Sequence, residues 1–307
     1  MSSSPSHAEP SIDAALGARA ASRSRGADFL SLTKPRLNFL VLLTTAAAYR
    51  LGVGPDSSPI VLLHTLVGTA LVAGGSAALN QVWEQETDRL MRRTRLRPLP
   101  DARLEASHAR LFGYGLSALG LLQLALFVNV LTAGVAFLTL ASYVWFYTPL
   151  KTRTSLSTIV GALPGALPAV IGWSAATNTL SIEAWVLFGI VFMWQMPHFL
   201  AIAWMYRDDY ARAGIPLLPV IQPDGRSTGR QAVLYTTGLI PITLMPFLIG
   251  LSTAAYLAGA VVLGAILLVF SLEFAVTRTV TAARRLFLAS ILYLPGLWVL
   301  LVWDHVR

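Results

Sequence analysis

The sequence predicts an all-α membrane protein, a bundle of about nine transmembrane helices. Of its 307 residues, 55% are hydrophobic and only 12% are charged. That charged share is about half of what soluble domains carry. The hydrophobic residues are also gathered into runs close to the roughly 20 residues needed to cross a bilayer. Composition and run length therefore agree on a polytopic membrane protein.

The predicted spans follow one another along almost the whole chain. They are expected near 37–54, 59–80, 108–127, 130–148, 156–174, 182–202, 231–250, 254–275 and 286–303. Spans three and four meet at FVNVLTAG, and spans seven and eight meet at GLSTAAY, so both pairs should form tight helical hairpins. Residues 1–27 are rich in serine, alanine and arginine and are predicted to be a disordered N-terminal tail, which leaves 28–307 as the transmembrane domain.

The lysines and arginines predict the orientation of the chain. Twenty-one of the 23 lie in the N-terminal segment or in the loops that follow the even-numbered spans. The positive-inside rule therefore places the N-terminus in the cytoplasm and the C-terminus outside. We expect a bacterial inner membrane, with the mitochondrial inner membrane as the alternative. Because topology accounts for most of the net charge of +8, no nucleic-acid partner is expected, and the lipid bilayer is the predicted environment.

The acidic residues are more informative than the basic ones, because topology does not require them. Asn80, Glu84 and Asp88 follow the second span at intervals of four. If the helix continues, they share one face, whereas Glu86 points elsewhere. Amide and carboxylate oxygens suit Mg²⁺, which usually binds one or two carboxylates together with substrate phosphate oxygens. The arginines that follow suit a phosphate. A lipid phosphate or diphosphate substrate is predicted; the alternative is a solvated cluster of mutually neutralising charges.

A second group of polar residues lies in and after the sixth span. Asp208 and Asp209 form an acidic pair on the same side as the first cluster, and Gln195 and His198 lie inside the apolar run. An ionisable residue within a span is a functional candidate by default. The alternative for His198 is that it bonds to backbone carbonyls freed by the neighbouring Pro197.

Two further stretches each have two interpretations. Lys151 and Arg153, in YTPLKTRTS, are either diphosphate ligands or charges that only fix topology. The stretch GALPGALP, 161–168, either breaks its helix to line a cavity or lets helices pack closely through small residues.

Five blocks carry a resemblance to a known family. They are LTKPRLNFLVLLT, NQVWEQETDRLMRRTRLRPLP, YTPLKTRTSLSTIVGALPGALP, IGW and WQMPHFLAIAWMYRDDYARAGIPLLPV. These blocks resemble those of the protohaem IX farnesyltransferases (haem O synthases), which are UbiA-type intramembrane prenyltransferases. The resemblance runs from about Leu32 to the last span. It implies a UbiA-like bundle around a cavity that opens to the cytoplasmic side and the lipid.

The resemblance also implies an activity, a cofactor and roles for single residues. The activity is transfer of the farnesyl group of farnesyl diphosphate to a vinyl group of haem b, giving haem O for terminal oxidases, with Mg²⁺ as cofactor. Haem A synthase or terminal oxidase assembly machinery would be partners. The implied catalytic residues are Asn80, Glu84, Asp88, Arg93, Arg97, Asp208 and Asp209, of which Glu84, Asp88, Asp208 and Asp209 would hold the metal. The implied substrate-binding residues are Lys151, Arg153, His198, Tyr147 and Gln195.

Other activities remain open at this point. One is a prenyltransferase of the quinone or chlorophyll pathway with the same fold. Another is a membrane transporter, whose ionisable site should lie near the bilayer midplane. In this sequence both acidic clusters lie at span ends, which favours the prenyltransferase.

Overall fold

The structure of the protein is a computed structural model that describes residues 24–53 and 58–305. In these ranges the regular secondary structure is helical, apart from one isolated bridge between Ser252 and His305. The predicted all-α fold is thus confirmed. Most of the predicted tail, residues 1–23, lies outside the described residues. Helix α2 (Arg25–Leu32) already begins within the range predicted as tail, because the Ser24 hydroxyl accepts a hydrogen bond from the Ala27 amide and caps the helix.

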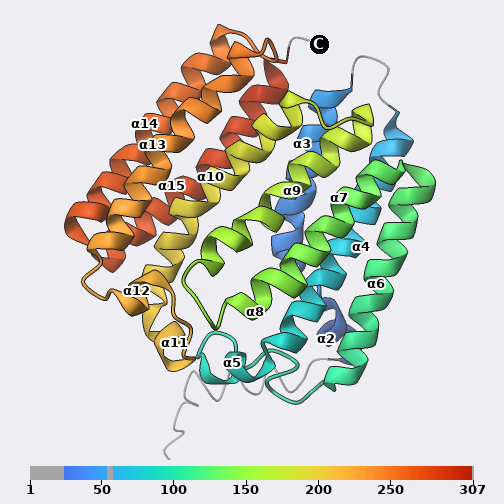
Figure 1. Ribbon diagram of the computed structural model, residues 1–307, viewed down its shortest axis with the longest axis vertical. Helices are drawn as coiled ribbons and strands as arrows, with labels where there is room; N and C mark the ends of the chain where they lie inside the picture. Colours follow the sequence, from blue (N-terminus) through green and yellow to red (C-terminus); the bar gives the residue numbers. More distant parts are fainter. Residues whose placement is uncertain (1–23, 54–57, 306–307) are drawn as a thin grey trace, which may run out of the picture.

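Nine long helical segments of the described residues form the bundle (Figure 1). They are α3 (Pro35–Gly52), α4 (Pro59–Trp83), α6 (Ala106–Phe127), α7 (Val130–Ala141) continued by η1 (Ser142–Tyr147) and α8 (Thr148–Leu150), α9 (Ser157–Thr177), α10 (Ile182–Met205), α13 (Arg226–Leu248), α14 (Ala254–Thr277) and α15 (Val280–Trp303). Three short helices lie in the connections, namely α5 (Gln85–Leu90), α11 (Arg207–Arg212) and α12 (Leu218–Ile221).

The long helices match the predicted spans closely. Within the described residues, eight of them are long and apolar enough to cross a membrane. The ninth, α3, has 18 residues and carries Arg36 and Arg50 near its two ends. The starts of α13 and α15 differ most from the prediction, since both helices begin in polar sequence before the apolar run. For α15 the cause is a cap, because the Thr279 hydroxyl accepts a hydrogen bond from the Ala282 amide at 3.1 Å.

Both predicted hairpins are present. Only Val128 and Asn129 separate α6 from α7, and residues 249–253 separate α13 from α14. The Asn129 side chain accepts from the Thr132 amide at 2.8 Å and donates to the Ser174 carbonyl of α9 at 3.0 Å. This side chain therefore caps α7 and holds the hairpin against α9.

The proline-rich helix α9 is continuous and closely packed. It runs without a break through Pro164 and Pro168. A methyl group added at Gly172 would overlap the backbone of Thr45 in α3, and one added at Gly165 would overlap the side chain of α10 residue Gln195. Of the two interpretations of GALPGALP, close packing through small residues is therefore the one that the structure supports.

Candidate active site

The two acidic blocks lie at the same end of the bundle. Figure 1 shows α5 and α11 at the end that carries α2, whereas α15 ends at the other. The two loops touch each other directly. The Arg93 guanidinium lies over the ring of Tyr206, 5.4 Å from its centroid, and Met91 packs in one buried cluster with Tyr210, Ala213 and other apolar side chains. Asp88 and Asp208, which are 120 positions apart in the sequence, therefore belong to blocks that meet at one end of the bundle.

The first block is the buried helical stripe that its spacing predicts. Backbone hydrogen bonds continue from α4 into α5, with Glu84 N donating to Asn80 O at 3.0 Å and Asp88 N to Glu84 O at 2.8 Å. Asn80, Glu84 and Asp88 are 1%, 7% and 1% exposed. The Glu86 side chain is 78% exposed and pairs with Arg89 at 3.0 Å. Glu86 thus points away from the other three, as expected.

Each oxygen-bearing side chain of this stripe is bonded to a different cation. The pairs are Lys34 with Asn80 Oδ1 at 2.9 Å, Lys151 with Glu84 Oε1 at 2.8 Å, and Arg97 with Asp88 Oδ2 at 2.6 Å. The cations come from the start of α3, from the residue after α8 and from the loop after α5. Charge-assisted bonds in a buried setting are strong and orient both partners. The stripe is therefore held in place from three separate parts of the chain.

These pairings shift the pKa values of three of the groups. Burial, together with nearby Arg97, lowers the pKa of Lys34 to about 8, although Glu84 acts in the opposite direction. For Glu84, burial alone would raise the pKa, but Lys151 and Lys34 more than offset this and bring it to about 2. For Lys151, burial works against the charged form, yet the contact with Glu84 leaves its pKa raised. Glu84 is therefore ionised, and its charge is held by Lys151.

The residues of the stripe fit a magnesium ion only together with a phosphate ligand. Asp88 Oδ1 is buried and has no hydrogen-bond partner, so a hard oxygen ligand is available beside Glu84 and Asn80. In the part of the chain that the structure describes, no three histidine, cysteine or acidic residues are grouped closely enough to hold a metal. Mg²⁺ commonly takes one or two carboxylates and completes its shell with substrate phosphate oxygens and water. The donor set matches that case.

The second acidic block contributes one buried carboxylate rather than two. Asp209 is 9% exposed and pairs with Arg212. The Asp208 side chain is 85% exposed and lies 3.9 Å from Arg207. Adjacent residues on the short helix α11 point in different directions, so the structure brings Asp209 towards the protein interior and leaves Asp208 on the surface.

The basic residues predicted from the sequence also divide into buried and exposed ones. The side chains of Arg97 and Lys151 are 26% and 14% exposed and belong to the stripe. Arg93 and Arg153 are exposed, with Arg93 held over Tyr206. Arg153 therefore does not share the buried position of Lys151, although the two are only two positions apart.

The remaining predicted residues lie deeper in the bundle. Tyr147 ends the π-helical segment η1 and stacks on Tyr143 with ring centroids 5.4 Å apart. Gln195 donates to the carbonyls of Ala162 and Val191 at 3.2 Å each, which ties α10 to α9. His198 Nδ1 lies 2.8 Å from the Ser290 hydroxyl of α15. The proposed bond between His198 and a carbonyl of its own helix is therefore wrong.

Three polar residues of the site were not predicted from the sequence. Besides Lys34, they are Thr148, whose hydroxyl accepts from Asn80 Nδ2 at 3.0 Å, and Tyr143, whose hydroxyl donates to Asn80 Oδ1 at 3.3 Å. Of these three residues, only Lys34 has a feature in the neighbouring sequence that could have indicated its unusual position. It precedes Pro35, and a residue before proline is disfavoured in helical backbone; Lys34 has a φ of 48° and turns its side chain back to α4.

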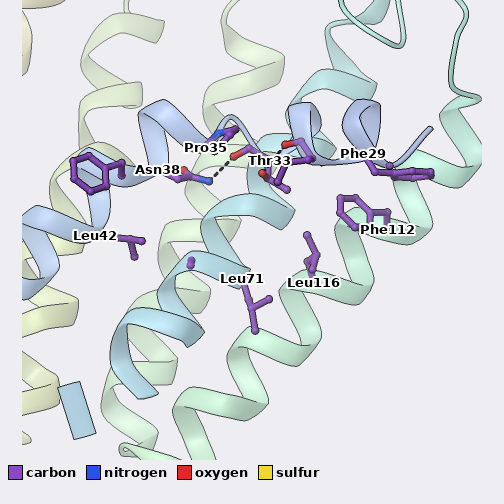
Figure 2. A pocket seen from close by; sticks show the side chains of 12 residues that line it. Phe29, Thr33, Pro35, Asn38, Leu42, Leu71, Phe112 and Leu116 are labelled. Atoms are coloured by element: carbon purple, nitrogen blue, oxygen red, sulfur yellow. Dashed lines mark hydrogen bonds between the residues drawn. The ribbon is translucent and has the colours of Figure 1, made fainter. Parts of the chain in front are cut away.

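An apolar groove of about 510 Å³ lies elsewhere on this end of the molecule. Figure 2 shows its walls, formed by Phe29 of α2, Leu42 of α3, Leu71 of α4 and Phe112 of α6, among others. None of the residues predicted as catalytic or substrate-binding lines it. The groove and the buried polar stripe are therefore separate features.

Comparison with known proteins agrees with this architecture. Residues 41–294 match the UbiA prenyltransferase family, and the chain belongs to that family. Membership of this family makes it a prenyltransferase, as the resemblance of its motifs implied.

Curated relatives define the branch of the family more narrowly. The chain is 49% identical over 287 residues to a protein of Solibacter usitatus named protoheme IX farnesyltransferase, covering 91% of this chain and 98% of the relative. It is 45% identical over 280 residues to the protein of the same name from Myxococcus xanthus, covering 91% and 95%. The resemblance of its motifs to those of the protohaem IX farnesyltransferases is therefore confirmed.

Solved structures support the fold. A digeranylgeranylglyceryl phosphate synthase superposes with a TM-score of 0.77 at 13% identity, covering 91% of this chain and 97% of that one. A UbiA homologue from Archaeoglobus fulgidus bound to GPP and Mg²⁺ gives a TM-score of 0.64 at 16% identity, covering 89% and 99%. Identities this low establish a shared bundle and no more.

Proposed function

We propose that this protein transfers the farnesyl group of farnesyl diphosphate to a vinyl group of haem b and so produces haem O. The observation that carries the proposal is the set of relatives named protoheme IX farnesyltransferase, among them one 49% identical over nearly its whole length. The buried stripe of Asn80, Glu84 and Asp88 with its three cations supplies the chemistry that such a donor needs.

The polar end of the bundle would bind the diphosphate. Glu84 and Asp88 would hold Mg²⁺, with Asn80 beside them and Asp209 as the carboxylate of the second block. When bound, Mg²⁺ would stabilise the charge of the departing diphosphate. Asp208 is a weaker ligand, because its side chain faces outward. Binding of Mg²⁺ in the Archaeoglobus fulgidus homologue supports a metal role in this fold.

Four cationic side chains would bind the diphosphate itself. Three of them are bonded to the stripe, namely Arg97, Lys151 and Lys34. The fourth, Arg93, lies over Tyr206. As the C–O bond to the farnesyl C1 breaks, its electron pair goes to the diphosphate. Donors already positioned around that growing charge lower the barrier. Lys151 and Arg97, which now neutralise carboxylates, would thus also neutralise the leaving group.

The acceptor step takes place among the apolar helices. The π electrons of the haem vinyl group form a C–C bond to C1 of the farnesyl group, which leaves a cation next to the porphyrin ring. Water adds to that cation and loses a proton, so that a hydroxyethylfarnesyl side chain results. The apolar surroundings keep water from the allylic carbon before the C–C bond forms. Tyr147 and Gln195 would line this region, and Arg153 at the surface would meet a haem propionate.

The positions of the basic loops support a location in a bacterial inner membrane. The N-terminus and the polar site would face the cytoplasm, and α15 would end on the outer side. The relatives reported above are bacterial. Product haem O would pass to haem A synthase or to terminal oxidase assembly.

A UbiA-type enzyme with another acceptor is the second candidate. The fold neighbour with a TM-score of 0.77 is named for a different product, digeranylgeranylglyceryl phosphate. Its identity of 13%, set against 49% for the Solibacter usitatus protein, favours haem b as the acceptor.

Haem extraction from a host without its own haem O synthase tests the proposal. The protein and its Glu84→Gln variant are expressed at equal membrane levels, and extracted haems are separated by chromatography. We expect haem O only with the unaltered protein. Membranes that contain the intact protein and yield haem b alone would overturn the haem assignment.

A further inference from the structure

The histidine inside α10 is enclosed by aromatic rings. His198 stacks on Trp194 with ring centroids 5.0 Å apart, faces Phe287 of α15 at 5.0 Å and meets Phe199 edge-on at 5.6 Å. The residue is half-buried. Its one polar contact is between Nδ1 and the hydroxyl oxygen of Ser290, at 2.8 Å. Ser290 itself is fully buried.

The hydrogen bonds of Ser290 determine where the imidazole carries its proton. The Ser290 hydroxyl also lies 2.7 Å from the Phe287 carbonyl oxygen. A carbonyl oxygen only accepts, and a serine hydroxyl has a single hydrogen. That hydrogen therefore points to Phe287 O, so Ser290 Oγ must accept from His198 Nδ1–H. Both short contacts are satisfied in this arrangement alone.

The other ring nitrogen of His198, Nε2, is then unprotonated and carries a free lone pair. Among residues 24–53 and 58–305, no carboxylate lies within ion-pair distance of His198. An imidazolium enclosed by aromatic rings without a counterion would be an uncompensated buried charge. The ring is therefore neutral, with its one proton on Nδ1 and a basic Nε2. Neutral imidazole nitrogen is a common metal ligand in proteins.

The position of this nitrogen suits the acceptor rather than the diphosphate. His198 precedes Tyr206, the residue that caps α10, by eight positions. At 1.5 Å per residue this places it about 12 Å from the end of the helix where the acidic loops lie. A lone pair at that depth, among aromatic side chains, fits a flat, apolar, metal-containing ring. The proposed reaction uses one such molecule, haem b.

We propose that His198 binds the iron of haem b through Nε2 and that Ser290 is a positioning residue that holds the required tautomer. The assignment rests on the proposed function for the identity of the ring. It adds an anchor for the porphyrin and a role for a serine 92 positions further along the chain. Partners that fix the tautomer of a ligating histidine usually contribute 10–100-fold to affinity.

Haem titration of the full-length protein in nanodiscs tests this assignment without relying on turnover. The protein, His198→Ala, Ser290→Ala and the matched control His64→Ala are titrated with ferric haem b, and the absorption spectrum is recorded. His64 is also a span histidine, bonded to Gln123 at 2.6 Å and stacked on Phe127 at 4.7 Å. Thermal melting and size-exclusion profiles confirm that each variant is folded.

The expected pattern separates ligation from general packing. His198→Ala should lose the spectrum of imidazole-bound haem and bind haem b at least about tenfold more weakly, and Ser290→Ala should weaken binding by about tenfold. Added imidazole should restore the spectrum of His198→Ala but not the affinity of Ser290→Ala. His64→Ala should behave like the unaltered protein.

The results that would contradict iron binding by His198 differ from those that would contradict the proposed transfer reaction. An unchanged haem spectrum in folded His198→Ala overturns the iron-binding assignment, even if the protein makes haem O. An equal loss in His64→Ala does the same, since it would show a general packing effect. Loss of the imidazole spectrum only in His198→Ala, in a protein that makes no haem O, supports the haem site and counts against the proposed transfer reaction.

Discussion

Replacement of Asp88 by asparagine probes the buried stripe most selectively. Asp88 is 1% exposed, one carboxylate oxygen bonds Arg97 at 2.6 Å, and the other is buried without a partner. Asparagine has nearly the same shape and still offers one oxygen to Arg97. It removes the negative charge and one of the two oxygen ligands. The variant therefore alters the proposed metal site with little change in packing.

The structural cost of Asp88→Asn should be modest and the catalytic cost large. Removing one partner of a buried ion pair costs about 3–5 kcal/mol. Arg97 keeps an acceptor and is 26% exposed, so about 1–2 kcal/mol is expected here. That shifts the melting temperature by roughly 2–8 °C. Loss of a group that stabilises a developing charge costs about 100- to 1,000-fold in turnover, equivalent to about 3–4 kcal/mol.

The assay compares purified Asp88→Asn with Glu86→Gln, a matched control two residues away. Haem O formation from farnesyl diphosphate and haem b is followed by chromatography, and melting is followed in the same detergent. Glu86 is a surface residue whose side chain is 78% exposed, so Glu86→Gln should change turnover by no more than about twofold. Asp88→Asn with more than a tenth of normal turnover, or Glu86→Gln equally impaired, would refute the assignment of the stripe.

Three further predictions concern the surroundings of the stripe and the bundle. Lys34→Met should reduce turnover about tenfold or more, since a charge-assisted bond to Asn80 is worth about 1.5–3 kcal/mol; steady-state kinetics will show it. Gly172→Ala should lower the melting temperature by several degrees, because the methyl group has no room against α3, whereas Gly134→Ala, with open space around it, should not. Bonds from the start of α14 lower the pKa of Asp304, so its stabilising effect is present above the unfolded value of 3.8 and is lost as the pH falls below it. The melting difference between the protein and Asp304→Asn should therefore vanish in acid.

Local geometry explains which parts of the site could be predicted. The stripe of Asn80, Glu84 and Asp88 depends only on a repeat of four and on a helix that continues beyond the membrane span. The same rule correctly separates Glu86 from the others. The spans could be predicted because each one needs about 20 apolar residues, whatever its neighbours are.

Contacts between distant segments explain what the sequence could not show. Lys34 lies 46 residues before Asn80, and no local rule pairs the start of one helix with the end of the next. Asp208 and Asp209 are adjacent in a six-residue helix, which is too short for periodicity to indicate which one is buried. The bond between His198 and Ser290 likewise depends on how α10 packs against α15.

Direct measurement of the transfer reaction tests the proposed function of the protein. Purified protein is incubated with farnesyl diphosphate and haem b, with Mg²⁺ or with excess chelator, and the haem product is identified by mass. We predict haem O in the presence of Mg²⁺ and at least about a hundredfold less without it, because charge on the leaving diphosphate would then be poorly stabilised. Equal formation of haem O in chelator would contradict the metal role of Glu84 and Asp88. Release of diphosphate without any farnesylated haem would contradict the proposed acceptor.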